Sequence, residues 1–87
     1  MKANRKEITR LLKISRGQID GILDMIEDDR YCIDISTQLI ATQAILARAN
    51  KEILLAHIGG CLQQAMLDGD VEEKTKELTK VIEKLLK

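Results

Sequence analysis

The two cysteines and the single histidine of this chain are its best candidates for metal or thiol chemistry. His57 and Cys61 are four positions apart, so on an α-helix their side chains face the same way and can chelate one ion. Residues 33–58 contain no glycine or proline. If this stretch is one α-helix, Cys32 lies roughly 37 Å from His57. One protomer therefore cannot close a site with all three residues. Two antiparallel copies can, because the Cys32 end of one helix then lies beside the His57–Cys61 end of the other.

A ligand set of two thiolates and one imidazole favours a soft metal ion. Sulfur donors select Cu(I), and three ligands suit Cu(I) better than Zn(II), which usually takes four. A fourth ligand or a water molecule would allow zinc instead. Spacing alone also permits a structural interpretation, in which the cysteines are small buried apolar residues and His57 is a polar residue on a helix surface.

Composition predicts that an all-α domain positions these residues. Of the 87 residues 45% are apolar, yet Tyr31 is the only aromatic residue and there is no proline. This profile is typical of a helical bundle rich in Leu, Ile and Ala, and it is poor for a β-sandwich. A core of this size is marginal by itself, so we expect an oligomer that buries further area between chains.

Three helices are predicted within a single domain spanning residues 1–87. The first runs from about residue 3 to 27, the second from about 32 to 68, and the third from about 71 to 86. Gly59-Gly60 is the weak point of the second helix. The predicted apolar seam of the first helix consists of Ile8, Leu12, Ser15, Ile19, Ile22 and Ile26. The predicted stripe of the second consists of Ile33, Thr37, Ile40, Ala44, Ala47, Leu54, Ile58, Leu62 and Ala65.

Charge is unevenly distributed along the chain, although the net charge is zero. Residues 1–16 carry six Lys or Arg against Glu7 alone, whereas residues 20–34 carry six Asp or Glu against Arg30. Four of the cations fall within an arc of ~80° on the first helix, roughly opposite its predicted seam: Lys2, Lys6, Arg10 and Lys13. This arc is either a solvated face or a stripe that contacts DNA phosphates. No helix-turn-helix, zinc-finger or ribbon signature accompanies it.

Membrane proteins and enzymes are disfavoured by the sequence. No apolar run approaches the ~18 residues of a membrane span, and the amino terminus has no signal-peptide pattern. We therefore expect a cytoplasmic protein with no membrane partner, whose thiols stay reduced. The carboxylates are scattered, and there is no nucleophile–base pair or phosphate-cradling glycine loop. Neither an enzyme nor a small-molecule substrate is expected.

Almost the whole chain, from about residue 8 to 86, resembles the copper-sensing operon repressor (CsoR) family. The resemblance rests on the strings Arg16-Gly17-Gln18-Ile19-Asp20-Gly21-Ile22, Met25-Ile26-Glu27 and Tyr31-Cys32-Ile33-Asp34-Ile35, followed by Gln38 and by His57 with Cys61. It implies a three-helix protomer, an antiparallel four-helix-bundle dimer, and a tetramer formed from two dimers. It also implies a repressor that binds operator DNA and is released by its ligand.

The ligand residues favour the copper-sensing branch of that family. Copper sensors resemble this chain in using Cys, His and Cys at the positions of Cys32, His57 and Cys61. Nickel and cobalt sensors have a His at the position of Cys61 and an additional amino-terminal ligand, formaldehyde sensors need an amino-terminal proline, and persulfide sensors lack the His. The resemblance thus implies a Cu(I)-responsive repressor. The alternatives are a thiol or persulfide sensor, a Ni, Co or Zn sensor of the same fold, and a helical scaffold with no DNA role.

The resemblance also suggests the residues around the metal and against the DNA. Tyr31 and Glu77 look like the family's tyrosine and glutamate that surround the ligand His, where a hydrogen bond to its free ring nitrogen would fix the tautomer. Family members often carry Arg at the position of Leu11, from which Arg10 is rotated by about 100°. The candidate DNA contacts are Lys6, Arg10, Lys13, Arg16, Arg48 and Lys51.

Overall fold

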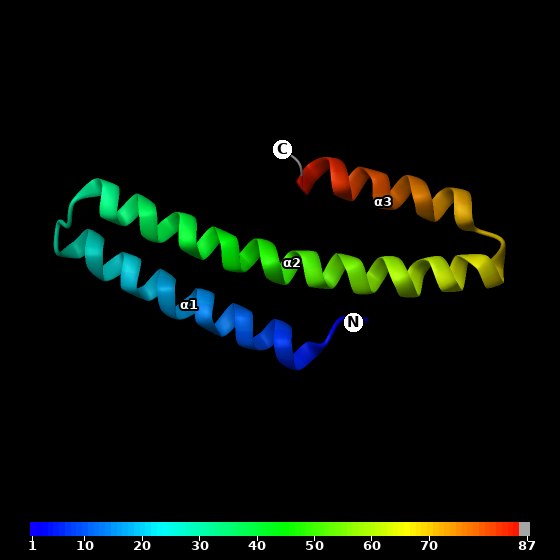
Figure 1. Ribbon diagram of the computed structural model, residues 1–87, viewed down its shortest axis with the longest axis horizontal. Coiled ribbons are helices and arrows are strands. Elements are labelled where there is room, and N and C mark those ends of the chain that lie inside the picture. The colour runs from blue at the N-terminus through cyan, green and yellow to red at the C-terminus, as the bar shows by residue number, and fades with distance from the viewer. Residues whose placement is uncertain (86–87) are drawn as a thin grey trace.

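The computed structural model describes residues 1–85, except for the side chains of Cys61, Leu62 and Leu85. The chain forms three α-helices, α1 (Arg5–Glu27), α2 (Cys32–Asp68) and α3 (Val71–Leu85), as Figure 1 shows. The predicted all-α protomer is therefore confirmed, with α2 at its predicted bounds. The predicted end of the third helix at Leu86 lies outside the described residues. No helix in the part of the chain described here is long and apolar enough to cross a membrane.

Local capping determines where the helices begin and end. The Asn4 side chain accepts a hydrogen bond from the Glu7 N–H at 3.2 Å, so α1 begins at Arg5 rather than at Ala3. Between α1 and α2, Asp29 takes a left-handed conformation with φ 53°. At the end of α2, Gly69 has φ 73° and the Asp70 N–H reaches back to the Ala65 carbonyl at 2.9 Å. Glycine at this position ends the helix without the steric cost of a Cβ.

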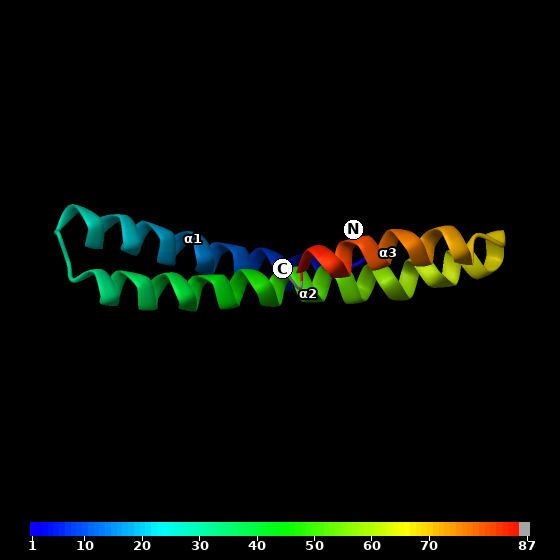
Figure 2. The same ribbon diagram turned by 90° about the horizontal axis from the view of Figure 1, so that it is seen from above.

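The helices form a thin, elongated molecule of 57 × 28 × 13 Å. Helix α1 packs along the first part of α2 and α3 along its last part, on opposite sides of α2 in Figure 1. Seen from above in Figure 2, α1 and α3 both lie on one side of α2. The accessible surface is 6884 Å², whereas a compact monomer of 9.8 kDa exposes about 5,200 Å². The protomer thus exposes about a third more surface than a compact protein of its mass.

The contact face of α1 differs from the predicted seam. Leu11, at 2% exposure, packs against α2 together with Ile8, Ser15 and Ile22, whereas Leu12 is 47% exposed. Successive helix positions differ by about 100°, so a face that includes Leu11 turns Leu12 away from α2. The predicted seam was therefore wrong at three of its six positions: Leu12, Ile19 and Ile26.

Polar contacts fix the same register between α1 and α2. The buried Thr42 hydroxyl of α2 lies 2.7 Å from the Gln18 Oε1 of α1 and 3.1 Å from the Gln38 carbonyl. The Ser15 hydroxyl, also buried, donates to the Leu11 carbonyl at 3.0 Å. Buried hydroxyls need such partners because an unpaired one is costly in an apolar interface.

The predicted stripe of α2 faces away from α1 along the first half of the helix. Ile33 and Ile40 are 56% and 63% exposed, while Thr42 and Ala49 are buried against α1. Further along, Ala65 of α2 and Leu78 of α3 are buried between those two helices. Helix α2 therefore carries apolar side chains on more than one side, and the side with Ile33 and Ile40 is left exposed by the described residues.

Candidate metal centre and nucleic-acid interface

Cys32 is the first residue of α2. Its thiol is free and exposed. Tyr31 immediately before it is the N-cap residue, with no side-chain capping bond and 65% exposure, and its carbonyl accepts the Asp34 N–H at 3.0 Å. None of the residues that the structure describes covers either side chain, so both are exposed on this part of the protomer.

His57 lies 25 residues further along the same helix and is exposed. Because α2 is unbroken from Cys32 to Asp68, the rise of the helix separates the Cys32 and His57 backbones by roughly 37 Å. Gly59 and Gly60 both remain helical, so the expected weak point does not interrupt the helix. The Cys61 backbone continues it, one turn beyond His57, but the Cys61 side chain lies outside the described part of the structure.

The three predicted ligands do not meet within one protomer. Among the side chains that the structure describes, no three His, Cys, Asp or Glu residues lie close enough to hold a metal ion. The positions of Cys32 and His57 near opposite ends of the region 32–61 match the separation predicted from the sequence. A site that uses all three residues must draw on a second chain.

The amino-terminal segment approaches α2 beside the His57–Cys61 turn. A Cβ placed on Gly60 would meet the Lys2 side-chain carbons at 3.0–3.3 Å, and Ala3 is buried. Lys2 precedes α1, so it does not belong to the helical arc of cations predicted from the sequence. Only Lys6, Arg10 and Lys13 of that arc are on the helix.

Glu77, the second residue expected near the ligand His, lies on α3. Helix α3 runs back along the part of α2 that contains His57 and Cys61 (Figure 1). Glu77 is exposed, and its Oε2 lies 3.6 Å from the Lys74 Nζ. Tyr31, by contrast, is at the far end of α2, so Tyr31 and Glu77 belong to opposite ends of the protomer.

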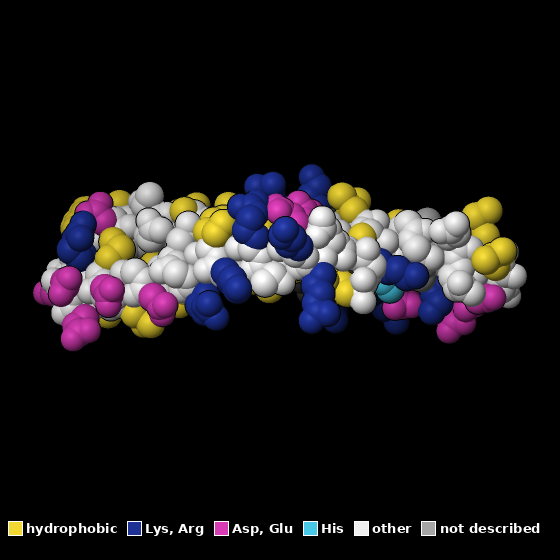
Figure 3. Space-filling model, turned by 90° about the horizontal axis from the view of Figure 1, so that it is seen from below, with side chains coloured by type: hydrophobic (Ala, Val, Ile, Leu, Met, Phe, Trp, Pro, Cys, Tyr) yellow, Lys and Arg dark blue, Asp and Glu magenta, His cyan; other side chains and the backbone are white. Residues whose placement is uncertain are grey.

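The candidate DNA contacts gather on the middle of the molecule. Helix α1 runs antiparallel to α2, so its basic first half lies beside the segment of α2 that contains Arg48 and Lys51. Figure 3 shows Lys and Arg side chains concentrated there, while Asp and Glu side chains gather at the end formed by the α1–α2 turn. The fold thereby joins two basic segments that are far apart in the sequence.

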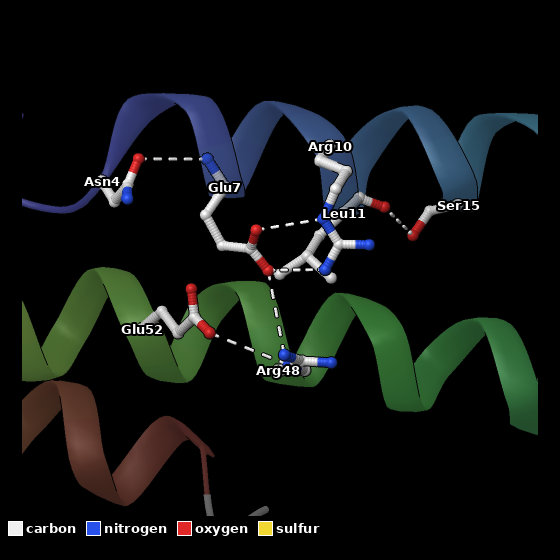
Figure 4. A network of polar contacts seen from close by, with 7 residues as sticks. All are labelled: Asn4, Glu7, Arg10, Leu11, Ser15, Arg48 and Glu52. Atoms are coloured by element: carbon white, nitrogen blue, oxygen red, sulfur yellow. Dashed lines mark hydrogen bonds and ion pairs between the residues drawn. The ribbon is translucent and has the colours of Figure 1, made fainter.

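Two of these candidates are already engaged by carboxylates. Arg10 donates to both Glu7 carboxylate oxygens, from Nε at 3.0 Å and from Nη2 at 2.6 Å. Arg48 of α2 places its Nη2 3.8 Å from the Glu7 Oε1 and its Nε 3.7 Å from the Glu52 Oε1 (Figure 4). The hydrogen bond from Arg10 lowers the pKa of Glu7 and raises the pKa of Arg10.

The remaining four candidates form no ion pair with any residue that the structure describes. These are the exposed side chains Lys6, Lys13, Arg16 and Lys51. Glu7 was not among the residues predicted for this surface. Its spacing of three from Arg10 predicts a helical ion pair, but its approach to Arg48 depends on how α1 and α2 pack.

Comparison with known proteins gives a consistent picture. The family model for the metal-sensitive transcriptional repressor matches residues 4–84. The copper-sensing transcriptional repressor CsoR of Mycobacterium ulcerans is 45% identical over 67 residues, which are 77% of this chain and 57% of that protein. The protein of the same name from Bacillus subtilis is 39% identical over 83 residues, which are 95% of this chain and 82% of that protein.

A solved structure extends the likeness to three dimensions. The crystal structure of the copper-sensing repressor CsoR with Cu(I) from Geobacillus thermodenitrificans has a TM-score of 0.87 to this chain at 36% sequence identity. The match covers 100% of this chain and 94% of that one. The mycobacterial CsoR proteins are longer than this chain. The match spans only 57% of the length of the protein from Mycobacterium ulcerans and 64% of that from Mycobacterium bovis.

Proposed function

The chain belongs to the family of metal-sensitive transcriptional repressors, and from this premise we propose that it is a Cu(I)-responsive repressor. It binds operator DNA without metal and releases it on binding Cu(I), which derepresses genes for copper resistance. The family consists of transcriptional regulators, so the chain is not an enzyme. A regulator of operator DNA acts in the cytoplasm, as the sequence predicts.

The unbroken α2 helix is the observation that carries this proposal. It places a thiol at one end and an imidazole, with Cys61 one turn further, toward the other. An antiparallel pair of α2 helices would bring Cys32 of one chain to His57 and Cys61 of the other. Two thiolates and one imidazole fit a soft, low-coordinate ion such as Cu(I). Tyr31 would then come near His57 of the other chain, where Glu77 of that chain's own α3 would orient the ring.

An unpartnered apolar surface supports the pairing of two chains. Ile33 and Ile40 are exposed on the side of α2 opposite α1. Further along α2, a hollow of about 190 Å³ is lined almost wholly by apolar side chains, among them Leu54 and Ile58 of α2 and Ile82 of α3. An antiparallel dimer would bury this surface, which the excess area of the protomer favours. Two such dimers would form the tetramer that the resemblance implies.

The basic middle of the molecule supplies the DNA contacts. Lys and Arg that neutralise phosphates and release counterions provide most of the affinity for a duplex. The proposed contacts are Lys6, Arg10, Lys13, Arg16, Arg48 and Lys51. Cu(I) that binds across the dimer would favour an arrangement of chains with lower DNA affinity. The effect is reciprocal, so DNA weakens Cu(I) binding by the same coupling, typically about 1–3 kcal/mol.

Fluorescence anisotropy of labelled operator DNA tests the mechanism directly. The metal-free protein is expected to bind with a steep salt dependence, and stoichiometric Cu(I) is expected to weaken binding by roughly 5- to 150-fold. Cys32→Ala serves as the matched control, since it removes one ligand from an exposed position and should bind DNA regardless of Cu(I). Unchanged affinity of the native protein with Cu(I) would contradict the mechanism.

A thiol- or persulfide-sensing repressor is the second candidate, favoured by the exposed free thiol of Cys32. This function would need Cys32 and Cys61 but not His57. His57→Ala separates the two: loss of the Cu(I) response supports the copper sensor, whereas a retained response to persulfide supports the sulfur sensor. Titration of the native protein with Ni(II), Co(II) and Zn(II) in the same assay examines the other metals.

A further inference from the structure

Glu7 is an acidic residue within a surface formed mainly by Lys and Arg side chains. Residues 1–16 hold six cations and Glu7 as their only acid. Its carboxylate lies between α1 and α2, within 3.0 Å of Arg10 and 3.8 Å of Arg48 (Figure 4). These two arginines come from different helices and are both candidate DNA contacts. A single carboxylate therefore engages a third of the proposed contacts.

The geometry at Glu7 is the one by which arginine recognises a phosphate. Arg10 presents two parallel N–H groups to the two carboxylate oxygens, and guanidinium groups bind phosphate oxygens in the same bidentate manner. The Glu7 side chain is 28% exposed, while Arg10 and Arg48 are 53% and 60% exposed. The arginines can therefore turn toward an external anion, whereas the carboxylate is held nearer the helix interface.

We propose that Glu7 is an internal competitor for DNA phosphate, which holds Arg10 and Arg48 until the operator displaces it. This inference rests on the proposed function, namely that the basic surface binds DNA. On binding, phosphate oxygens replace the Glu7 carboxylate as partners of the two guanidinium groups. Glu7 is then left as an unpaired anion close to the phosphates. The carboxylate lowers the affinity of the metal-free protein for any duplex. A larger share of the operator affinity then comes from sequence-dependent contacts, and Cu(I) dissociates the DNA more completely.

Glu7→Gln is the variant that tests this inference. Glutamine keeps the length of the side chain but removes its charge, and the bond from the Glu7 N–H to Asn4 is a backbone contact that the substitution retains. Removing weak exposed ion pairs and one repulsive charge should tighten DNA binding about 3- to 30-fold at 0.15 M salt. The slope of log affinity against log salt should steepen by up to about 0.9, because the variant adds one net positive charge to the surface that faces the DNA phosphates.

Glu72→Gln is the matched control. Glu72 is on α3, pairs with Lys76 at 3.8 Å and is 90% exposed, so the variant makes the same change of charge away from α1. It should alter affinity by less than about twofold, since exposed pairs are weak and distant charges are screened. In a background of Arg10→Ala with Arg48→Ala, Glu7→Gln should lose most of its effect, because the competition needs the arginines and only the repulsion between Glu7 and the phosphates remains.

Anisotropy with labelled operator DNA across a salt series distinguishes the possible outcomes. Tighter binding by Glu7→Gln that depends on the two arginines supports the competitor. Weaker binding would instead identify Glu7 as a residue that positions the arginines for DNA. An effect equal to that of Glu72→Gln would show that only the net charge of the protein matters. Either result overturns the inference while the proposed function stands. No salt-sensitive DNA binding by the native protein would overturn both.

Discussion

Glu7 differs from the other acids of the chain because an arginine from its own helix and one from α2 both approach its carboxylate. The contact between Glu7 and Arg10 also affects the stability of the protein in the absence of DNA. The hydrogen bond from Arg10 lowers its pKa below the ordinary value of 4.5. A carboxyl group whose pKa is lower in the folded state stabilises that state above its unfolded pKa, and this contribution is lost as pH falls through the folded value.

The Glu7 pKa therefore predicts a pH effect confined to acid conditions. An NMR titration of the side-chain carboxyl carbon should give a pKa below 4.5, and Arg10→Ala should raise it toward that value. Acid unfolding of Glu7→Gln should in turn lose a small part of its pH dependence below about pH 4.5. Arg16→Ala, which removes an arginine of the same helix without an ion pair, is the control. A Glu7 pKa that does not respond to Arg10→Ala would contradict the contact.

The positions of the helices could be predicted from the sequence more accurately than the faces by which they pack together. Helical periodicity and the absence of proline predict α1, α2 and the start of α3 almost where they are observed. The contact face of α1 was missed because Leu11 and Leu12 are both apolar, so two stripes compete and only the packing against α2 selects one. The same packing brings Arg48 to Glu7. Spacing along one helix could predict Arg10 as a partner of Glu7, but no local pattern reveals a contact between helices.

The Thr42–Gln18 hydrogen bond offers a test of the observed register. Thr42→Val keeps the shape of the side chain but leaves the half-buried Gln18 amide oxygen without its partner at 2.7 Å. We expect it to lower the free energy of unfolding by about 1 kcal/mol in chemical denaturation. Thr79 is exposed and its hydroxyl donates to the Thr75 carbonyl of its own helix, so Thr79→Val should change this free energy by less than about 0.5 kcal/mol. Equal effects of the two variants would argue against the α1–α2 interface described here.

Across the whole molecule, the protomer is thin and leaves apolar side chains exposed, which supports the proposed assembly of several chains. The chain is 57 Å long but only 13 Å thick, and it exposes large apolar residues along α2. The separation of Cys32 from His57 could be predicted from the absence of helix breakers between them. The arrangement of a second chain could not, because it depends on which apolar side of α2 is left uncovered by α1 and α3.

A charged residue in the exposed stripe should therefore disrupt assembly. Ile40 is 63% exposed in the protomer, and Ile40→Glu would place a carboxylate in the proposed dimer interface, where burying it unpaired is costly. Light scattering should give a dimer or tetramer for the native protein and a smaller mass for this variant. Leu67→Glu, at a 79% exposed position of α2 outside the predicted stripe, should keep the native mass. A native mass for Ile40→Glu would exclude this face from the interface.

The proposed Cu(I) site takes ligands from two chains, and mixed assemblies of two variants can test this arrangement. Cys32→Ala and His57→Ala chains with different tags are produced together, and assemblies that contain both are isolated and titrated with Cu(I) against a competing chelator. Each variant alone should lack tight binding. A mixed antiparallel dimer combines an intact Cys32 with an intact His57–Cys61 pair, so tight binding should reappear at up to one site per dimer, with two sulfur ligands and one nitrogen by X-ray absorption. Mixed assemblies that bind Cu(I) as weakly as either parent, or tight binding by Cys32→Ala alone, would exclude a site shared between two chains.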